Sequence, residues 1–233
     1  AGRTSAWNLA RAASLLPRAI ACNRKTRPVM TQPSISLVGN APHERDRSAA
    51  IDASDSVIRI NNCFGLGGVN GSRTTHLFLI NCGGQMREWL DDPDFLARPA
   101  VAQADEILLP IHPQKDDLIE PPLNEAERKA PDARNWAPEA EAMLRANDRT
   151  VTRVGVDIFL RACGVIGYTR PQRDMSAPST GLIALLWALE TFGGPIDVYG
   201  FGFDGWDGHR WNRERAFFET MQDEGRARLH PLT

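Results

Sequence analysis

The segment from Ser176 to Phe192 constrains the fold more than any other part of the chain. Pro178 disfavours helix at the residue before it, and Ser179 and Thr180 are good N-cap residues, so a helix is predicted to begin here. The residues after Gly181 are apolar on nearly every side of that helix, which indicates a buried helix. Only its first turn then faces a cleft, where free N–H groups and the helix dipole suit a phosphate. An ordinary N-cap without a ligand is the alternative.

Composition limits the class of protein. The 233 residues are 42% hydrophobic and 24% charged, which suffices for one sizeable core, so a single domain is expected. The formal net charge of -2 gives no reason to expect nucleic acid as a partner. The four cysteines have neither Cys-x-x-Cys spacing nor neighbouring histidines, which argues against a zinc site or redox motif and favours free thiols.

Residues 1–32 are predicted to form an N-terminal extension or linker, and residues 33–233 the folded domain. The extension is rich in Ala and Arg, and Arg3, Arg11 and Arg18 interrupt its apolar runs. This pattern excludes a membrane-spanning helix there and argues against a signal peptide. A basic amphipathic segment in contact with a membrane surface is the alternative to a disordered or partner-bound extension.

Apolar strands alternate with helical patterns from Pro33 onward. Strands are predicted over 35–38, 56–60, 75–80, 106–110 and 151–154, and helices over 48–53, 85–90, 124–130, 138–146, 156–163 and 213–226. This alternation predicts a three-layer α/β/α, Rossmann-like single domain with a mostly parallel sheet. The polar stretch 112–148 is interpreted either as a lid or as an insertion on the acceptor side.

Two of the predicted strands end at asparagines. Asn40 follows the strand 35–38, and Asn61 follows the strand 56–60. Ligands of open α/β sheets bind beyond the carboxyl ends of the strands, where side-chain amides can hydrogen-bond a ribose, a base or a phosphate. Asparagine also tolerates tight turns, so a structural role is equally compatible with the pattern.

The glycine-rich stretch 65–71 has the composition of a dinucleotide-binding loop. That motif joins a strand to a helix, whereas here the predicted strand 75–80 follows. The glycines are therefore predicted to form a flexible loop without a nucleotide.

Several short motifs follow one another in a fixed order. They are VGN at 38–40, residues 51–61 with GSRTTH at 71–76, PSTG at 178–181 with DVYGFG at 197–202, and a His and a Glu separated by four residues at His209 and Glu214. In order and approximate spacing they resemble the large, small and very small sialylmotifs of the family 29 sialyltransferases. The resemblance extends over residues 35–229, and its small motif is the most specific part.

This resemblance implies a GT-A-like variant of the α/β fold and a set of binding residues. Asn40 and Asn61 would contact the phosphate or ribose of CMP. The remaining residues carried over are Ser179, Thr180 and Gly181 for the phosphate or the sugar carboxylate, and Gly200, Phe201 and Gly202 for the nucleotide pocket. A helix N-terminus and amide side chains can hold a single phosphate without a metal, so no metal ion and no cofactor is expected.

The reaction implied is a metal-independent, inverting transfer of sialic acid from CMP-sialic acid to a hydroxyl of an acceptor glycan. His209 is the predicted general base, because an unprotonated imidazole is available near neutral pH. Asn212 is expected to cap a helix over 213–226, which places Glu214 in its first turn. Two alternatives stay open: a transferase that uses CMP-Kdo, and a CMP-sugar-binding module that has lost catalysis.

The chain also departs from the family. Animal members join the large and small motifs by a disulfide, whereas Ile35 and Phe192 stand at the corresponding positions here, which implies an apolar contact instead. Folding without an oxidising compartment fits a bacterial, cytoplasmic enzyme, with peripheral contact to the inner membrane as a variant of that prediction. The family's His-Tyr motif before the catalytic His is missing, and Trp206 and Asp207 are the candidates to replace it.

Overall fold

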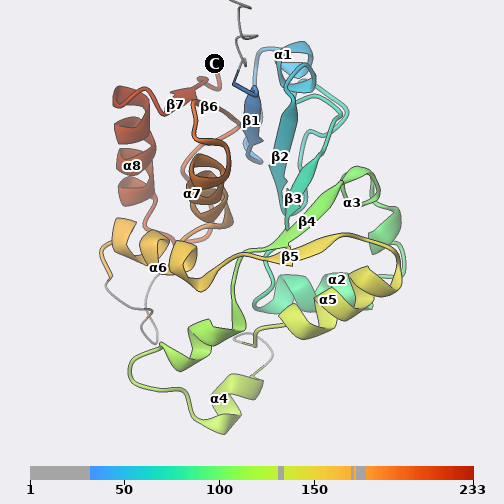
Figure 1. Ribbon diagram of the computed structural model, residues 1–233, viewed down its shortest axis with the longest axis vertical. Coiled ribbons are helices and arrows are strands. Elements are labelled where there is room, and N and C mark those ends of the chain that lie inside the picture. Colours follow the sequence, from blue (N-terminus) through green and yellow to red (C-terminus); the bar gives the residue numbers. More distant parts are fainter. Residues whose placement is uncertain (1–31, 131–133, 169–170, 172–176) are drawn as a thin grey trace, which may run out of the picture. The chain divides into compact units, whose positions relative to one another are not determined.

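A computed structural model describes residues 32–130, 134–168, 171 and 177–233 (Figure 1). The predicted N-terminal extension lies outside these residues except for Gln32, so its assignment stays a prediction. The strands are β1 Ile35–Val38, β2 Ser56–Ile60, β3 His76–Phe78, β4 Glu106–Leu109, β5 Val151–Arg153, β6 Ile196–Tyr199 and β7 Ala227–Leu229. The α-helices are α1 Ser48–Asp52, α2 Gly84–Asp91, α3 Pro99–Gln103, α4 Glu125–Lys129, α5 Ala137–Ala146, α6 Val156–Val165, α7 Thr180–Phe192 and α8 Trp211–Asp223, with short 3-10 helices η1 Phe95–Ala97 and η2 Pro113–Asp117.

The strands form one seven-stranded parallel sheet in the order β5-β4-β3-β2-β1-β6-β7. Chain order runs outward from β1 in one direction as far as β5, and then resumes with β6 on the other side of β1. The winding therefore reverses between β1 and β6, and open α/β sheets bind ligands beyond the carboxyl ends of the strands at such a point. The parallel sheet confirms the predicted fold class.

Helices cover both faces of the sheet. One apolar cluster joins the inward faces of α6, α7 and α8 to β1, β2 and β6, and a second joins α2, α3 and α5 to β3 and β4. The long helix α7 lies in the first cluster and buries residues 180–185 almost completely, as its apolar sequence predicts. This arrangement is the three-layer α/β/α domain expected from the sequence, and residues 33–233 form one compact unit.

Most element boundaries agree with the sequence patterns, but the last helix does not. Helix α8 begins at Trp211 rather than Arg213, and its N-cap is Arg210 rather than the predicted Asn212. The Arg210 carbonyl accepts the first helical hydrogen bonds, from the N–H groups of Arg213 and Glu214 at 2.9 and 3.1 Å. The helix also ends three residues early, because the chain turns at Gly225, whose φ is +70°, into the unpredicted strand β7.

The glycine-rich stretch 65–71 is a loop that leads to β3, as predicted. The Arg59 side chain, only 1% exposed, donates from Nε to the Arg73 carbonyl at 2.8 Å and from Nη2 to the Asn70 carbonyl at 2.7 Å. The Asp52 carboxylate accepts hydrogen bonds from the N–H groups of Ser72 and Arg73, each at 2.9 Å. These residues of the large motif therefore fix a loop, because a buried guanidinium must find acceptors.

The first apolar cluster contains Ile35, and Phe192 packs against the same cluster. Both side chains thus belong to one apolar environment, and a direct contact between them stays a prediction. Cys63, Cys82 and Cys163 are free thiols. Among the described helices, none combines the length and hydropathy that crossing a bilayer requires.

Gly39 controls how closely the ends of β1 and β6 approach. Its N–H donates to the Tyr199 carbonyl at 2.8 Å, and a Cβ at this position would lie 2.3 Å from the backbone oxygen of Gly200. We expect Gly39→Ala to lower the free energy of unfolding by about 1–3 kcal/mol, since backbone must move to relieve the overlap. Urea denaturation measures the change.

The matched control for this substitution is Gly164→Ala. Gly164 lies inside α6, and a Cβ there meets no atom within 4 Å. Alanine should raise helix stability at that position by roughly 1 kcal/mol. Equal stability of the two variants would contradict the packing role assigned to Gly39.

Candidate active site

Asn40 ties the ends of β1 and β2 together. Its Nδ2 donates to the Ile60 carbonyl at 3.3 Å, and its Oδ1 accepts from the Phe64 N–H at 3.0 Å. The side chain lies at the carboxyl edge of the sheet, as predicted, but both ends of its amide already have partners within the chain. Its position is thereby fixed, and one Nδ2 hydrogen stays available for a ligand.

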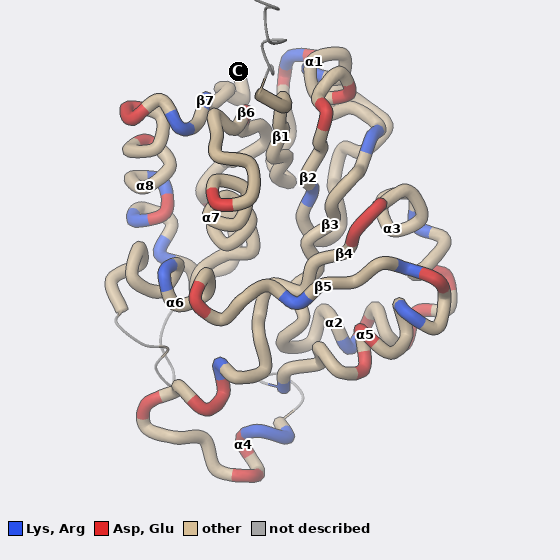
Figure 2. The backbone as a smooth tube through the Cα atoms, in the orientation of Figure 1, with Lys and Arg blue, Asp and Glu red and all other residues tan. Residues whose placement is uncertain are grey.

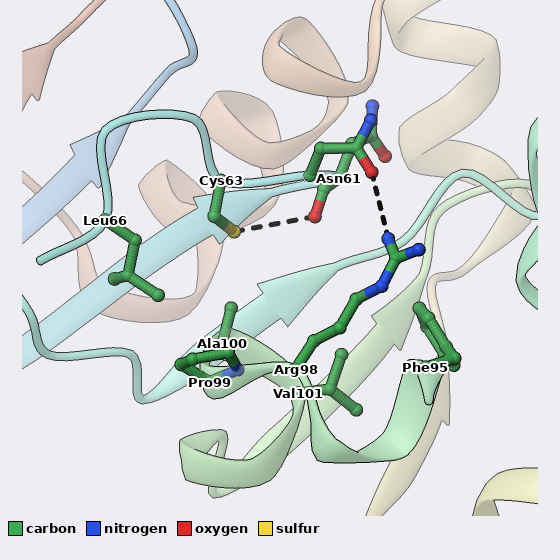
Figure 3. Close-up of a pocket in the computed structure, with 9 residues that line it drawn as sticks. Asn61, Cys63, Leu66, Phe95, Arg98, Pro99, Ala100 and Val101 are labelled. Atoms are coloured by element: carbon green, nitrogen blue, oxygen red, sulfur yellow. Dashed lines mark hydrogen bonds between the residues drawn. The ribbon is translucent and has the colours of Figure 1, made fainter. Parts of the chain in front are cut away.

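Asn61 lies at the carboxyl end of β2 with a φ of +52°. Its Oδ1 accepts from the Ile80 N–H at 2.9 Å, while its Nδ2 has no hydrogen-bond partner among the described residues. It also lines a cavity of about 240 Å³ together with Cys63 and Arg98 (Figure 3). The oxygen of the amide is therefore structural, and its nitrogen is the part that can bind a ligand.

Ser179 is engaged inside the protein. Its Oγ accepts from the Leu182 N–H at 3.1 Å, as an N-cap should, and donates to the Glu214 carboxylate, which also accepts from the Ser179 N–H at 2.8 Å. Ser179 and Thr180 are each 6% exposed. Both residues are therefore buried and do not face an open cleft, contrary to the prediction. A carboxylate from α8 occupies the Ser179 hydroxyl.

Glu214 is 1% exposed and lies in the first turn of α8, as predicted. Burial raises the pKa of its carboxyl, while the hydrogen bonds from Ser179 act in the opposite direction. Both carboxylate oxygens bind Ser179, which lies 35 residues earlier in the chain. The side chain thus joins α8 to α7 and acts as a positioning residue.

Gly181 and Phe201 pack directly on each other. A Cβ on Gly181 would lie 2.6 Å from Cε1 of Phe201, whose ring centroid is 5.0 Å from that of Phe218. Gly181 therefore gives room to a ring of the core. Gly200, with a φ of +69°, brings β6 against the end of β1, and the Gly202 carbonyl accepts from Arg215 at 3.1 Å. These residues of the small motif therefore pack at the carboxyl edge of the sheet, and the contacts given for them are structural.

His209 lies in the loop before α8, as predicted, and its ring has a defined orientation. Nδ1 lies 2.7 Å from the Ala177 carbonyl oxygen. A carbonyl can only accept, so Nδ1 carries the proton and Nε2 of the neutral ring holds a free lone pair. The rings of Trp206 and Trp211 flank the imidazole edge-on, with centroids 4.9 and 4.8 Å away. Burial lowers the pKa of His209 from its ordinary value of 6.5, against the opposing effect of the Ala177 carbonyl.

Two parts of this arrangement were not recognised in the sequence. Ala177 acts through its backbone carbonyl, for which a sequence carries no signal. Trp211 acts both as a neighbour of the imidazole and through its Nε1, which donates to the Trp206 carbonyl at 3.2 Å. Within the described ranges, no group of three or more His, Cys, Asp and Glu side chains is arranged to hold a metal ion.

The candidate site therefore comprises a buried helix start, two amide side chains at the carboxyl ends of β1 and β2, and an oriented imidazole. A family model described as glycosyltransferase family 29 (sialyltransferase) matches residues 38–230. By class the protein is thus a glycosyltransferase. The chain belongs to glycosyltransferase family 29.

Three further proteins are similar to this chain over 85% of its length. A urease operon 23 kDa accessory protein of Rhizobium meliloti (strain 1021) is 27% identical over 225 residues, which cover 85% of this chain and 93% of that protein. A crystal structure of a mammalian sialyltransferase has a TM-score of 0.52 at 15% identity, covering 85% of this chain and 69% of the other. A mammalian sialyltransferase in complex with Gal-beta-1-3GalNAc-ortho-nitrophenol covers the same shares, with a TM-score of 0.50 at 16% identity. The two solved structures are similar to this chain in fold.

Proposed function

We propose that the protein transfers sialic acid from CMP-sialic acid to a hydroxyl of an acceptor glycan, with inversion and without a metal ion. The acceptor oxygen forms a bond to the anomeric carbon of the sugar as the bond from that carbon to the CMP phosphate oxygen breaks. CMP leaves with the bonding electron pair, and the acceptor hydroxyl gives its proton to His209. The transition state has oxocarbenium character, as in glycoside hydrolysis.

The observation that carries this proposal is the orientation of His209. The Ala177 carbonyl holds the proton on Nδ1, so Nε2 can accept a proton from an acceptor hydroxyl. Its lowered pKa keeps the ring neutral at physiological pH. A general base needs both properties, namely a free lone pair and the correct protonation state.

We place the nucleotide at the carboxyl ends of β1 and β2, where Asn40 and Asn61 lie. Asn61 supplies the free Nδ2, and Asn40 supplies an amide hydrogen beside it. Glu214 occupies only the Ser179 N–H and hydroxyl at the start of α7. The N–H groups of Thr180 and Gly181 are buried and have no acceptor among the described residues, so a phosphate reaches them at the positive end of the α7 dipole only if the groups packed around them move apart. Ser179 contributes by shaping this helix start together with Glu214 rather than by direct contact.

Release of CMP tests the proposed function. CMP-sialic acid and CMP-Kdo are each incubated with the protein in the presence of EDTA, with and without Gal-beta-1-3GalNAc, and CMP is followed by NMR. Release of CMP from CMP-sialic acid alone supports the proposal. Release of CMP from CMP-Kdo alone shows that the donor is CMP-Kdo instead. Tight CMP binding without release from either donor, with or without that acceptor, favours a binding module that has lost catalysis.

The pH dependence of transfer follows from the lowered pKa of His209. The active form is the deprotonated imidazole, so we expect the turnover number to fall on the acid side with a midpoint below pH 6.5. Turnover measured at a series of pH values between about pH 5 and pH 8 gives this midpoint. A midpoint above pH 6.5 would contradict the conclusion that burial of the ring is the dominant influence on the pKa of His209.

A further inference from the structure

Two arginines at the start of α8 have no carboxylate partner among the described residues. Arg210 is the N-cap of the helix and Arg213 lies in its first turn. The start of α8 lies beside α6 (Figure 2). A Cβ at Gly167 would lie 3.0 Å from Nη1 of Arg213 and 3.5 Å from Nη1 of Arg210. Both guanidinium groups thus converge on a residue that has no side chain. Two like charges held this close repel each other unless an anion lies between or beside them.

Arg210 is held in place by neutral groups. Its Nη1 donates to the Ile166 carbonyl at 3.0 Å, and its Cζ lies 4.1 Å from the centroid of the Tyr168 ring. The carbonyl lies just past the end of α6, where a cation is favoured by the helix dipole. It satisfies only one of the five N–H donors of the guanidinium. The side chain is therefore held in place while most of its N–H donors have no acceptor in the described part of the chain.

Tyr168 adds an independent observation. The residue is 7% exposed, and its buried hydroxyl has no hydrogen-bond partner among the residues that the structure describes. A buried hydroxyl without a hydrogen-bond partner costs free energy, and a bound ligand that supplies the partner removes this cost. The start of α8 also lacks a side-chain cap, which leaves the N–H groups of Trp211 and Asn212 without an acceptor among the described residues. A phenol hydroxyl, two guanidinium groups and a helix start together have the chemistry of an anion site.

We propose that Arg210, Arg213 and Tyr168 bind a carboxylate or phosphate on the acceptor, so that the acceptor is an acidic glycan. The inference rests on the proposed function, because it places the acceptor beside His209, the residue directly before Arg210. The nucleotide site uses the α7 start and the ends of β1 and β2, and the acceptor site uses the start of α8. The acidic group then orients the acceptor hydroxyl toward Nε2 of His209.

Binding of acidic and neutral saccharides tests the anion site directly. The CMP-saturated protein is titrated by NMR with 3′-sialyllactose against lactose and with glucose 6-phosphate against glucose. We expect at least one acidic member to bind roughly tenfold or more tightly than its neutral counterpart, since charge-assisted hydrogen bonds discriminate at that level. Arg210→Gln combined with Arg213→Gln should remove the preference, and Tyr168→Phe should weaken it.

The control is Arg87→Gln, which removes an exposed positive charge from α2 and should keep the preference. No preference in the wild type, or an undiminished preference in the double variant with native chemical-shift dispersion, overturns the anion site. CMP release from the donors is measured on the wild type in parallel. A preference without CMP release rejects the proposed transferase while the anion site stands, and release without a preference does the reverse.

Discussion

His209→Ala should lower the rate of sialic acid transfer by roughly 10²–10⁴-fold, the range in which a general base contributes. The reason is that Nε2 is the free base of a ring fixed by the Ala177 carbonyl at 2.7 Å. CMP affinity should change little, because the proposed nucleotide contacts come from Asn61 and the start of α7. Calorimetric titration of CMP and single-turnover transfer separate the two effects.

A second histidine serves as the control for this variant. His112 caps the short helix η2 through Nδ1, which accepts from the Gln114 N–H at 3.2 Å. His112→Ala should cost about 1 kcal/mol of stability at most and leave transfer near the wild-type rate. A folded His209→Ala protein that no longer binds CMP would show that this side chain belongs to the nucleotide site instead.

Glu214→Ala should lower the free energy of unfolding by about 3 kcal/mol, because it removes two hydrogen bonds to a charged group and leaves the buried Ser179 N–H unpaired. Glu214→Gln should lose about 1 kcal/mol or less, since an amide oxygen can still accept from that N–H. Urea denaturation of the two variants measures the difference. Comparable losses in both would show that the negative charge itself is required.

The sign of the pH dependence distinguishes these variants further. The pKa of Glu214 is raised from 4.5 in the folded protein, so the folded state binds a proton more tightly than the unfolded state does. Its contribution to stability is complete below pH 4.5 and is lost as the pH rises through the folded pKa. The stability of wild type relative to Glu214→Gln should therefore decrease as the pH rises above 4.5. An increase would contradict burial as the cause of the shift.

The order of local patterns along the chain was sufficient to predict the fold class. Strands such as Ile35–Val38 and Ser56–Ile60 have the bounds that were predicted. A short apolar run that ends at Gly or Asn is typical of a buried strand in a parallel sheet, and the Gly or Asn marks its end. The pattern for helix α7 was equally clear, since its hydroxyl residues predicted where the helix begins and its all-round apolar surface predicted its burial. In such segments the residues of the segment itself determine its secondary structure.

The start of α8 is a different case. Asn212 is the better cap by intrinsic preference, yet Arg210 takes that position while its side chain binds beyond the end of α6 and stacks on Tyr168. Contacts between distant segments outweigh a local preference of about 1 kcal/mol. The boundary of this helix could therefore not be predicted from its own residues.

The sequence by itself determined where the candidate site residues lie along the chain and in the elements of the fold. It placed Asn40 and Asn61 at strand ends and His209 before a helix, because those positions follow from local patterns and motif order. Only the tertiary structure decided what each group does. Ser179 is occupied by a carboxylate 35 residues away, and His209 takes its tautomer from a backbone carbonyl. Such roles depend on which donors and acceptors meet in space, and a backbone carbonyl is the same in every residue type.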